Sequence, residues 1–275
     1  MSDVPLEVVP LRRWWTWAGS AAVALVAAGV LLSVASNPGF GWPVVAEYVL
    51  DPQILLGLLR TLELTLAAMA IGLVLGTALA VMRLSGNALL ATLAFGYVWF
   101  FRSVPVLVQL IFWYNFGALY PVVALRVPFG PVLWSASTNS VITPLSAALA
   151  GLGLAQAAYT AEVIRAGILS VPAGQTRAAK ALGMRPGTIF VRIVFPQAMR
   201  VIIPPVGNEV ISMVKNTSLV SVIALAELLY TAQLIYARTY ETIPLLLVAS
   251  LWYLLVVSVL SVGQHALERR FRRGL

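Results

Sequence analysis

Residues 58–82 decide the class of protein, and they read LLRTLELTLAAMAIGLVLGTALAVM. Arg60 and Glu63 are the charged residues of this stretch, and a helix needs about 20 apolar residues to cross the hydrocarbon core of a bilayer. Of the 275 residues in the chain, 60% are hydrophobic and 10% are charged. Soluble domains have about 45–50% apolar and about 25% charged residues. The sequence therefore predicts an all-α, polytopic integral membrane protein.

Apolar runs predict about six transmembrane helices. In chain order, the expected spans are 14–36, 58–82, 104–119, 145–164, 206–229 and 243–262. Residues 88–120 would form about 50 Å of helix, which is too long for one crossing, so we expect 88–101 to lie at the membrane interface and Ser103 to cap the next helix. We expect an irregular stretch over 37–53 and an exposed loop over 121–144. A retained helix over 14–36 is preferred to a signal peptide because the apolar run is long.

The basic residues predict an orientation. The net charge is +8. With six spans, most of the 18 Lys and Arg residues lie on the side of the termini; the exceptions are Arg60, Arg126, Arg238 and Lys215. Cytoplasmic loops of membrane proteins carry an excess of Lys and Arg. We therefore expect both termini in the cytoplasm. Because the basic residues are spread over every inner loop, they do not indicate a nucleic-acid partner.

The residue types present exclude several function classes. The chain has no cysteine and one histidine, His265, so disulfide frameworks, cysteine metal sites and His-based triads are excluded. We expect no cofactor, metal site or catalytic residue on this chain, because its scattered acidic residues form no catalytic constellation. A secondary transporter driven by an ion gradient is the alternative, but it would need two repeat halves, and no internal repeat is found.

The segment 170–183 reads SVPAGQTRAAKALG and predicts a short cytoplasmic helix. Ser170 is the expected N-cap, and Gly183 is the expected left-handed residue at the other end. The small residues Ala178, Ala179 and Ala181 would let another surface approach closely. A docking element and an ordinary inner loop explain this pattern equally well.

A second cytoplasmic helix is expected over 188–195. Proline interrupts the hydrogen-bond ladder of a helix. We therefore expect a kink at Pro196 and an end at Pro204 and Pro205.

This loop resembles the cytoplasmic motif of the membrane subunits of bacterial ATP-binding-cassette importers for polar amino acids. The family pattern is Glu-Ala-Ala, three residues, Gly, nine residues and Ile-x-Leu-Pro. This chain keeps both spacings with Arg177-Ala178-Ala179, Gly183 and Ile193-Val194-Phe195-Pro196. It departs from the pattern at Phe195, which replaces Leu, and at Arg177, which replaces Glu and reverses a charge. Further matches to the amino-acid branch, within about residues 55–265, are Gly174-Gln175, Thr61-Leu62-Glu63-Leu64-Thr65, Phe101-Arg102-Ser103-Val104-Pro105, Val108-Gln109, Ala158-Tyr159-Thr160-Ala161-Glu162, Pro196-Gln197-Ala198, Pro204-Pro205-Val206-Gly207-Asn208-Glu209 and Lys215-Asn216-Thr217-Ser218-Leu219.

The resemblance implies a domain organisation and a function. Residues 55–265 would form a permease core of five transmembrane helices in a bacterial inner membrane. Residues 1–54 would add a cytoplasmic tail, an extra transmembrane helix and an outer loop, and 266–275 would be a basic cytoplasmic tail. The function implied is the translocation of amino acids, with polar or charged ones expected.

The resemblance also implies partners. The loop 170–200 would couple the permease to a separate ATPase through residues Gly174, Gln175, Arg177, Ala178, Ala179, Ala181, Gly183 and Pro196. This chain has no phosphate loop for ATP, because neither of its lysines, Lys180 and Lys215, follows a glycine. ATP and Mg²⁺ would therefore be bound by two such ATP-binding subunits. The assembly would add a second permease subunit, the same or homologous. An extracytoplasmic amino-acid-binding protein would deliver substrate to the outer loops 37–53 and 121–144.

The ionisable residues within the expected spans are candidates for a substrate pathway, and they are Glu63, Glu162, Glu209, Lys215 and Glu227. Such groups cost several kcal/mol in hydrocarbon, and they face a cavity or a partner. Glu162 either pairs with Arg165 or faces the pathway together with Tyr159. Glu227 is expected to reach water at the outer end. The expected pathway residues are Tyr159, Glu162, Lys215, Thr217 and Ser218. For the small hydroxyl residues Thr217 and Ser218, helix packing explains the residue types equally well.

Overall fold

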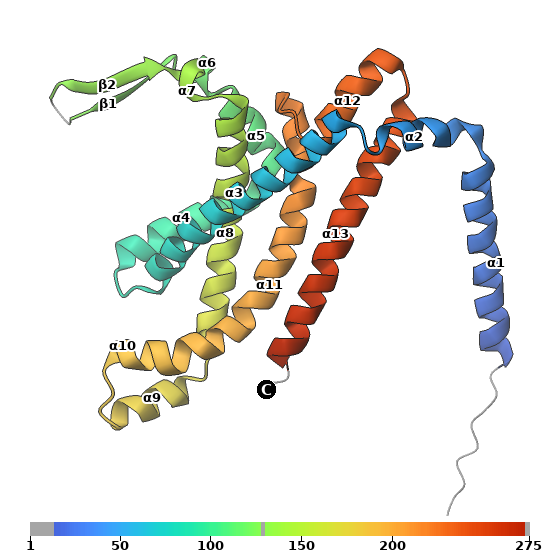
Figure 1. Cartoon of the computed structure of the whole chain (residues 1–275). Coiled ribbons are helices and arrows are strands. Elements are labelled where there is room, and N and C mark those ends of the chain that lie inside the picture. The colour runs from blue at the N-terminus through green and yellow to red at the C-terminus, as the bar shows by residue number, and fades with distance from the viewer. Residues whose placement is uncertain (1–13, 128–129, 273–275) are drawn as a thin grey trace, which may run out of the picture.

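The computed structural model describes residues 14–127 and 130–272, and most of them are helical (Figure 1). The α-helices are α1 (Trp14–Ser36), α2 (Trp42–Tyr48), α3 (Pro52–Leu84), α4 (Ala88–Ser103), α5 (Val106–Tyr114), α6 (Phe116–Leu119), α7 (Thr138–Val141), α8 (Pro144–Leu169), α9 (Ala173–Ala181), α10 (Pro186–Ile189), α11 (Phe195–Asn216), α12 (Leu228–Thr239) and α13 (Thr242–Arg272). Short 3₁₀ helices form η1 (Pro38–Phe40) and η3 (Thr217–Ile223), and a π-helical turn forms η2 (Phe190–Val194).

The prediction of a polytopic helical membrane protein is confirmed. Within the described residues, five helical segments are long and apolar enough to cross a membrane: α1, α3, α8, the joined segment 186–223, and α13. If the bent pair of helices α4 and α5 counts as one span, the number of candidate membrane spans is six. We call the part of the molecule where α9 lies the α9 end. Helix α1 starts there, and helix α13 finishes there (Figure 1). The opposite end, which carries β1 and β2, is the hairpin end.

Helices α3 and α8 pack against each other through small residues at the centre of the molecule. Gly72 and Gly76 lie one turn apart on α3. A Cβ added at Gly76 would lie 2.8 Å from the Cβ of Thr160 and 2.9 Å from the carbonyl oxygen of Ala157. Lipid tails are as apolar as leucine, so helices associate in a membrane where small residues let their backbones come close. This contact buries much of α8 and makes it the central helix.

The segment 104–119 differs from the single span predicted for it. Helix α5 has nine residues, which is about 13 Å of helix and too short to cross a bilayer alone. It meets α4 at an angle of 100°. Ser103 ends α4 instead of capping α5, and Pro105 stands at the N-cap position of α5. Proline disfavours helical geometry in the residue before it, so the two helices bend apart here.

Helix α11 runs through the prolines that were expected to end a helix. Pro204 and Pro205 lie inside α11, so the predicted stop is wrong. Pro196, where a kink was predicted, lies in the first turn of α11, directly after the π-helical turn η2. Neighbouring helices can satisfy backbone groups around prolines in a membrane. At this point α13 packs against α11, and the side chain of Gln264 donates a hydrogen bond to the carbonyl of Pro204 at 2.8 Å.

The chain turns at the hairpin end after η3, so the expected span over 206–229 ends at Ile223. Ala224 has a φ of 58° in the left-handed region. Glu227 then caps α12 and is completely buried, so the prediction that it reaches water is wrong. Its carboxylate accepts hydrogen bonds from the backbone N–H groups of Leu229 (3.0 Å) and Tyr230 (2.8 Å) and from the hydroxyl of Tyr253 (2.8 Å). The hydroxyl of Thr61 on α3 donates a longer bond of 3.3 Å.

The connections at the hairpin end contain more regular structure than expected. Residues 37–53 form η1 and α2. Within 121–144 the antiparallel strands β1 (Val122–Arg126) and β2 (Val132–Ser137) form a hairpin, followed by α7. The hairpin projects sideways from the top of α8 (Figure 1).

The packing of α3 on α8 predicts the effect of a methyl group at Gly76. We expect Gly76→Ala to lower the midpoint of thermal unfolding in detergent, because the added Cβ overlaps the backbone of α8 and overpacking costs about 1–3 kcal/mol. Gly96→Ala is the matched control, since a Cβ at Gly96 of α4 would meet open space. Equal unfolding midpoints for the two variants would contradict the packing argument.

The buried carboxylate of Glu227 predicts a second effect on stability. Glu227→Ala removes the acceptor of four hydrogen bonds from α3, α12 and α13, and leaves their donors buried. We expect it to lower the free energy of unfolding by about 2–5 kcal/mol. Tyr253→Phe removes one of these bonds and should cost about 1 kcal/mol.

The matched control for this experiment is Glu241→Ala at an exposed position, which should change the free energy of unfolding by less than about 0.5 kcal/mol. Thermal unfolding in detergent measures all three variants. A Glu227→Ala variant as stable as the control would mean that the hydrogen bonds to this carboxylate do not hold the hairpin end together.

Candidate functional site

Helix α9 begins two residues later than its sequence suggested. Pro172 is its N-cap residue and makes no side-chain capping bond. Ser170 instead follows α8, and its hydroxyl donates to the carbonyl of Gly167 at 2.7 Å. The prediction of Ser170 as an N-cap is therefore wrong, because the serine completes the preceding helix.

The other end of α9 has the conformation predicted for Gly183. This glycine has a φ of 74°. Its N–H donates to the carbonyl of Lys180 at 2.9 Å, and the N–H of Met184 donates to the carbonyl of Ala179 at 3.1 Å. These two bonds form a Schellman motif, which closes a helix with a left-handed residue. A residue with a Cβ would be strained at this position.

One face of α9 is held against the rest of the chain. Ala179 is buried in an apolar cluster with Ile189 and Val194. The side chain of Gln197 on α11 donates to the side-chain oxygen of Gln175 at 2.6 Å. Ala179 and Gln175 therefore fix the position of α9 relative to α11.

The opposite face of α9 is exposed at the α9 end of the molecule. Leu182 is 83% exposed. Arg177 is exposed and forms no ion pair with a carboxylate of the described residues. The predicted coupling residues on exposed positions are Gly174, Gln175, Arg177, Ala178, Ala181, Gly183 and, at the start of α11, Pro196.

A groove of about 460 Å³, lined by several polar residues, lies between α8 and α11. Glu209 is the one charged residue that lines it, and it accepts a hydrogen bond from Gln156, which lies beside Gly72 of α3. Ligand pockets commonly enclose about 300–1,000 Å³ and hold a few polar groups. The lining residues are Gln156, Tyr159, Pro204, Pro205, Asn208, Glu209, Ser212 and Asn216.

Tyr159 is the residue of this groove that the pathway prediction included. The guanidinium carbon of Arg102 lies 5.3 Å from the centre of its ring. Glu162, one turn further along α8, pairs with Arg165 through two hydrogen bonds, of which Nε to Oε2 is 3.0 Å. The interpretation of Glu162 as half of a local ion pair is thus the one that the structure supports.

The remaining pathway candidates lie elsewhere on α11 and η3. Lys215 and Ser218 line a second groove of about 420 Å³ with Ser250, Tyr253 and other residues of α13. Thr217 is completely buried, and its hydroxyl donates to the carbonyl of Val214 at 2.7 Å. The structure therefore does not bring the five candidates into one site.

Sequence reasoning missed Gln156, Asn208, Ser212 and Asn216 as lining residues. A signal was available, because 208, 212 and 216 are four residues apart and share one face of a helix. The expected stop at Pro205 hid this pattern. Once α11 continues through the prolines, all three polar side chains face the same groove.

Comparison with known proteins identifies the chain's family. Residues 68–273 match the family described as "Binding-protein-dependent transport system inner membrane component". The chain belongs to this family. The resemblance found in the sequence is confirmed, and the chain is a membrane transport component, not an enzyme.

Several members of the binding-protein-dependent transport family are similar over most of the chain. An arginine transport system permease protein of Corynebacterium glutamicum is 43% identical over 272 residues, which cover 98% of this chain and 84% of that protein. A probable glutamine ABC transporter permease protein of Bacillus subtilis is 34% identical over 218 residues, covering 79% and 93% of the two chains. A solved structure described as an amino acid ABC transporter with histidines has a TM-score of 0.68 and 33% identity, and covers 80% and 94%.

The Schellman motif predicts the effect of a branched side chain at Gly183. The left-handed conformation costs about 1–2 kcal/mol for a residue with a Cβ. In Gly183→Val we therefore expect hydrogen exchange at the last turn of α9 to accelerate by about 5–30-fold, and transport to fall. Gly187→Val is the control, because Gly187 is exposed, has no positive φ and would meet open space. If both variants exchange alike, Gly183 does not define the end of α9.

Proposed function

We propose that this chain is the permease subunit of an ATP-driven importer of amino acids, and that its substrate is a cationic amino acid. The family supports the transport role, and the names of its relatives support the amino-acid class. The groove between α8 and α11 carries the proposal of a cationic substrate. Among its lining residues one is charged, and that residue, Glu209, is an acid.

The groove offers the contacts that a cationic amino acid needs. The carboxylate of Glu209 can accept charge-assisted hydrogen bonds from a guanidinium or an ammonium group. Asn208, Ser212 and Asn216 add amide and hydroxyl groups, and the ring of Tyr159 adds a flat wall. Lys215 and Ser218 lie in the neighbouring groove along the same helical segment. We assign the substrate pathway to the faces of α11 that carry these two grooves.

The α9 end is the cytoplasmic end in this proposal. Arg177, Lys180, Arg185 and Arg192 lie on or beside α9 and α10, and cytoplasmic loops carry an excess of such residues. Both termini are then cytoplasmic, in a bacterial inner membrane. The hairpin end faces outward and receives substrate from an extracytoplasmic amino-acid-binding protein.

The exposed face of α9 is the proposed contact with a separate ATPase. We propose an assembly of two ATP-binding subunits, which bind ATP and Mg²⁺, and two permease subunits. Small residues at Gly174, Ala178 and Ala181 allow close approach, and Leu182 offers an apolar contact. Arg177 stands where the family pattern has glutamate. This reversal of charge is compatible with the contact, because an exposed ion pair contributes only about 0–1 kcal/mol.

Replacing Glu209 by glutamine tests the cationic-substrate proposal. The probes are radiolabelled arginine and citrulline, which differ at the end of the side chain by a cationic guanidinium and a neutral urea group. We expect the permease–ATPase complex in nanodiscs, without binding protein, to prefer arginine. In Glu209→Gln the dissociation constant for arginine should rise about 10-fold or more, because a hydrogen bond to a charged group contributes about 1.5–3 kcal/mol.

The control for this experiment is Glu241→Gln, the same chemical change at an exposed position outside the groove. It should leave both dissociation constants unchanged. If Glu209→Gln keeps the preference for arginine over citrulline, then Glu209 does not recognise the cationic group.

A further inference from the structure

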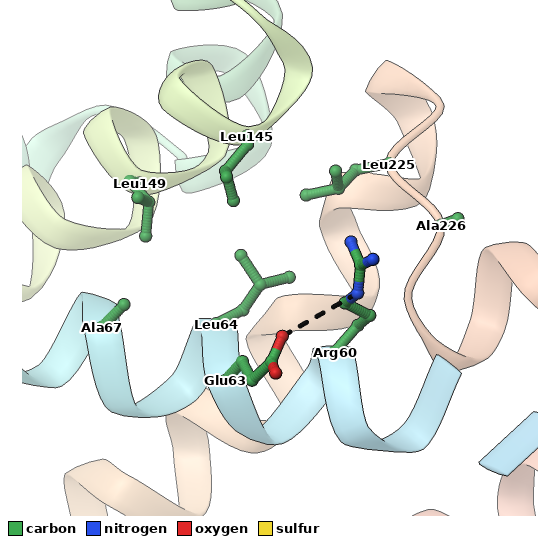
Figure 2. A pocket seen from close by; sticks show the side chains of 8 residues that line it. All are labelled: Arg60, Glu63, Leu64, Ala67, Leu145, Leu149, Leu225 and Ala226. Carbon is green, nitrogen blue, oxygen red and sulfur yellow. Dashed lines mark ion pairs between the residues drawn. The ribbon is translucent and has the colours of Figure 1, made fainter. Parts of the chain in front are cut away.

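A pocket of about 240 Å³ lies at the hairpin end, away from the two grooves along α11. It is enclosed by α3, by the start of α8 and by the segment after η3 (Figure 2). Leu145 and Leu149 approach it from α8, and Leu225 approaches it from the opposite side. Its volume lies below the range of about 300–1,000 Å³ that is common for drug-sized ligands, so it suits a small molecule.

One face of α3 supplies the charged groups of this pocket. Arg60, Glu63, Leu64 and Ala67 are spaced three, four and seven residues apart, so they lie on one side of the helix and line the pocket together (Figure 2). The carboxylate and the guanidinium therefore stand side by side at the rim, with apolar side chains beyond them.

The ion pair between Arg60 and Glu63 is loose. Nε of Arg60 lies 3.8 Å from Oε2 of Glu63, and the two side chains are 55% and 59% exposed. An exposed pair of this kind contributes about 0–1 kcal/mol, so a ligand can separate it at little cost. The pair of Arg165 with Glu162 differs, because two hydrogen bonds join it and both side chains are more buried.

The position of this pair in the chain also indicates a polar partner. Arg60 lies eight residues into a helix that crosses the membrane, about 12 Å along its axis. Charged side chains within a membrane-crossing helix face a water-filled cavity or a binding partner, because hydrocarbon is costly for them. Two such charges at the rim of one pocket are therefore placed for a ligand that carries both signs.

We propose that this pocket is an outer subsite that binds the zwitterionic end of an α-amino acid before it enters the pathway. The guanidinium of Arg60 binds the α-carboxylate, for which its planar set of donors is suited. The carboxylate of Glu63 accepts hydrogen bonds from the α-ammonium group. The apolar side chains of Leu64, Leu145 and Leu149 contact the aliphatic part of the substrate. This assignment rests on the proposed function, because it requires an amino-acid substrate.

Binding of radiolabelled arginine in the Glu209→Gln background isolates this subsite. The permease–ATPase complex is placed in nanodiscs without nucleotide or binding protein, and the weakened groove leaves the outer pocket as the remaining site. We expect saturable binding at one site per permease. Arg60→Met or Glu63→Gln in this background should weaken it by about 10-fold or more. Arg238→Met, at an exposed arginine of the hairpin end, is the matched control and should leave it unchanged.

Competition identifies the part of the ligand that is recognised. Glycine, which has the zwitterion and no side chain, should displace arginine from the outer site. Argininamide, which lacks the carboxylate, should compete at least 10-fold less well. Thermal unfolding midpoints equal to that of the Glu209→Gln parent should show that the Arg60 and Glu63 variants are folded.

Three results would overturn the subsite. They are no saturable binding in the Glu209→Gln background, unchanged binding in Arg60→Met, and equal competition by argininamide. Each of these leaves the proposed function in place if the unmodified complex binds arginine. If the unmodified complex binds no arginine, the proposed function itself fails.

Discussion

The close contact between α3 and α8 fixes the position of α8, and α8 supports several of the other helices. In a bilayer, helix association depends on packing and hydrogen bonds, because lipid tails are as apolar as the helices. Gly72 and Gly76 let α8 approach α3 until side chains of one helix touch the backbone of the other. Helix α8 then supports its other neighbours, with Ala157, Ala158 and Ala161 packed on α4 and Gly167 against Ile202 of α11.

This contact also builds the groove. A Cβ at Gly72 would lie 2.4 Å from Cγ of Gln156, so the glycine makes room for the glutamine side chain. Gln156 in turn donates a hydrogen bond to Glu209 on α11. The position of the acidic group in the groove therefore depends on the absence of a side chain on α3.

Helix α11 connects the two regions to which we assign function. Near its start, Gln197 bonds to Gln175 of α9, and its later turns carry the polar face of the groove. Because the helix continues through Pro204 and Pro205, it gives a direct physical route between α9 and Glu209. A displacement of α9 by an ATPase would thus reach the groove through one element.

The parts of the fold that depend on local sequence could be predicted. Long apolar runs indicated the spans of α1, α3, α8 and α13, because span length is set by the thickness of the bilayer. The left-handed conformation of Gly183 followed from its position after an alanine-rich helix. The pairing of Glu162 with Arg165 followed from their spacing of three residues.

The parts that failed depend on residues distant in the sequence. Helix α11 continues through two prolines and packs there against α13, where Gln264, 60 residues after Pro204, lies against Gly207 and bonds to the carbonyl of Pro204. Glu227 is buried because Thr61, 166 residues before it, and Tyr253 supply hydrogen bonds. The polar lining of the groove was missed for the same reason, since it needs α11 to continue and α8 to lie beside it.

We propose that ATP hydrolysis by a partner chain drives amino-acid uptake through this permease. Uptake of radiolabelled arginine into proteoliposomes that contain the permease and its ATPase, with binding protein added on the outward-facing side, tests this coupling. We expect accumulation that requires ATP on the α9 side and continues when ionophores collapse all ion gradients. Uptake that stops with the ionophores and does not depend on ATP would contradict it and favour an ion-driven transporter.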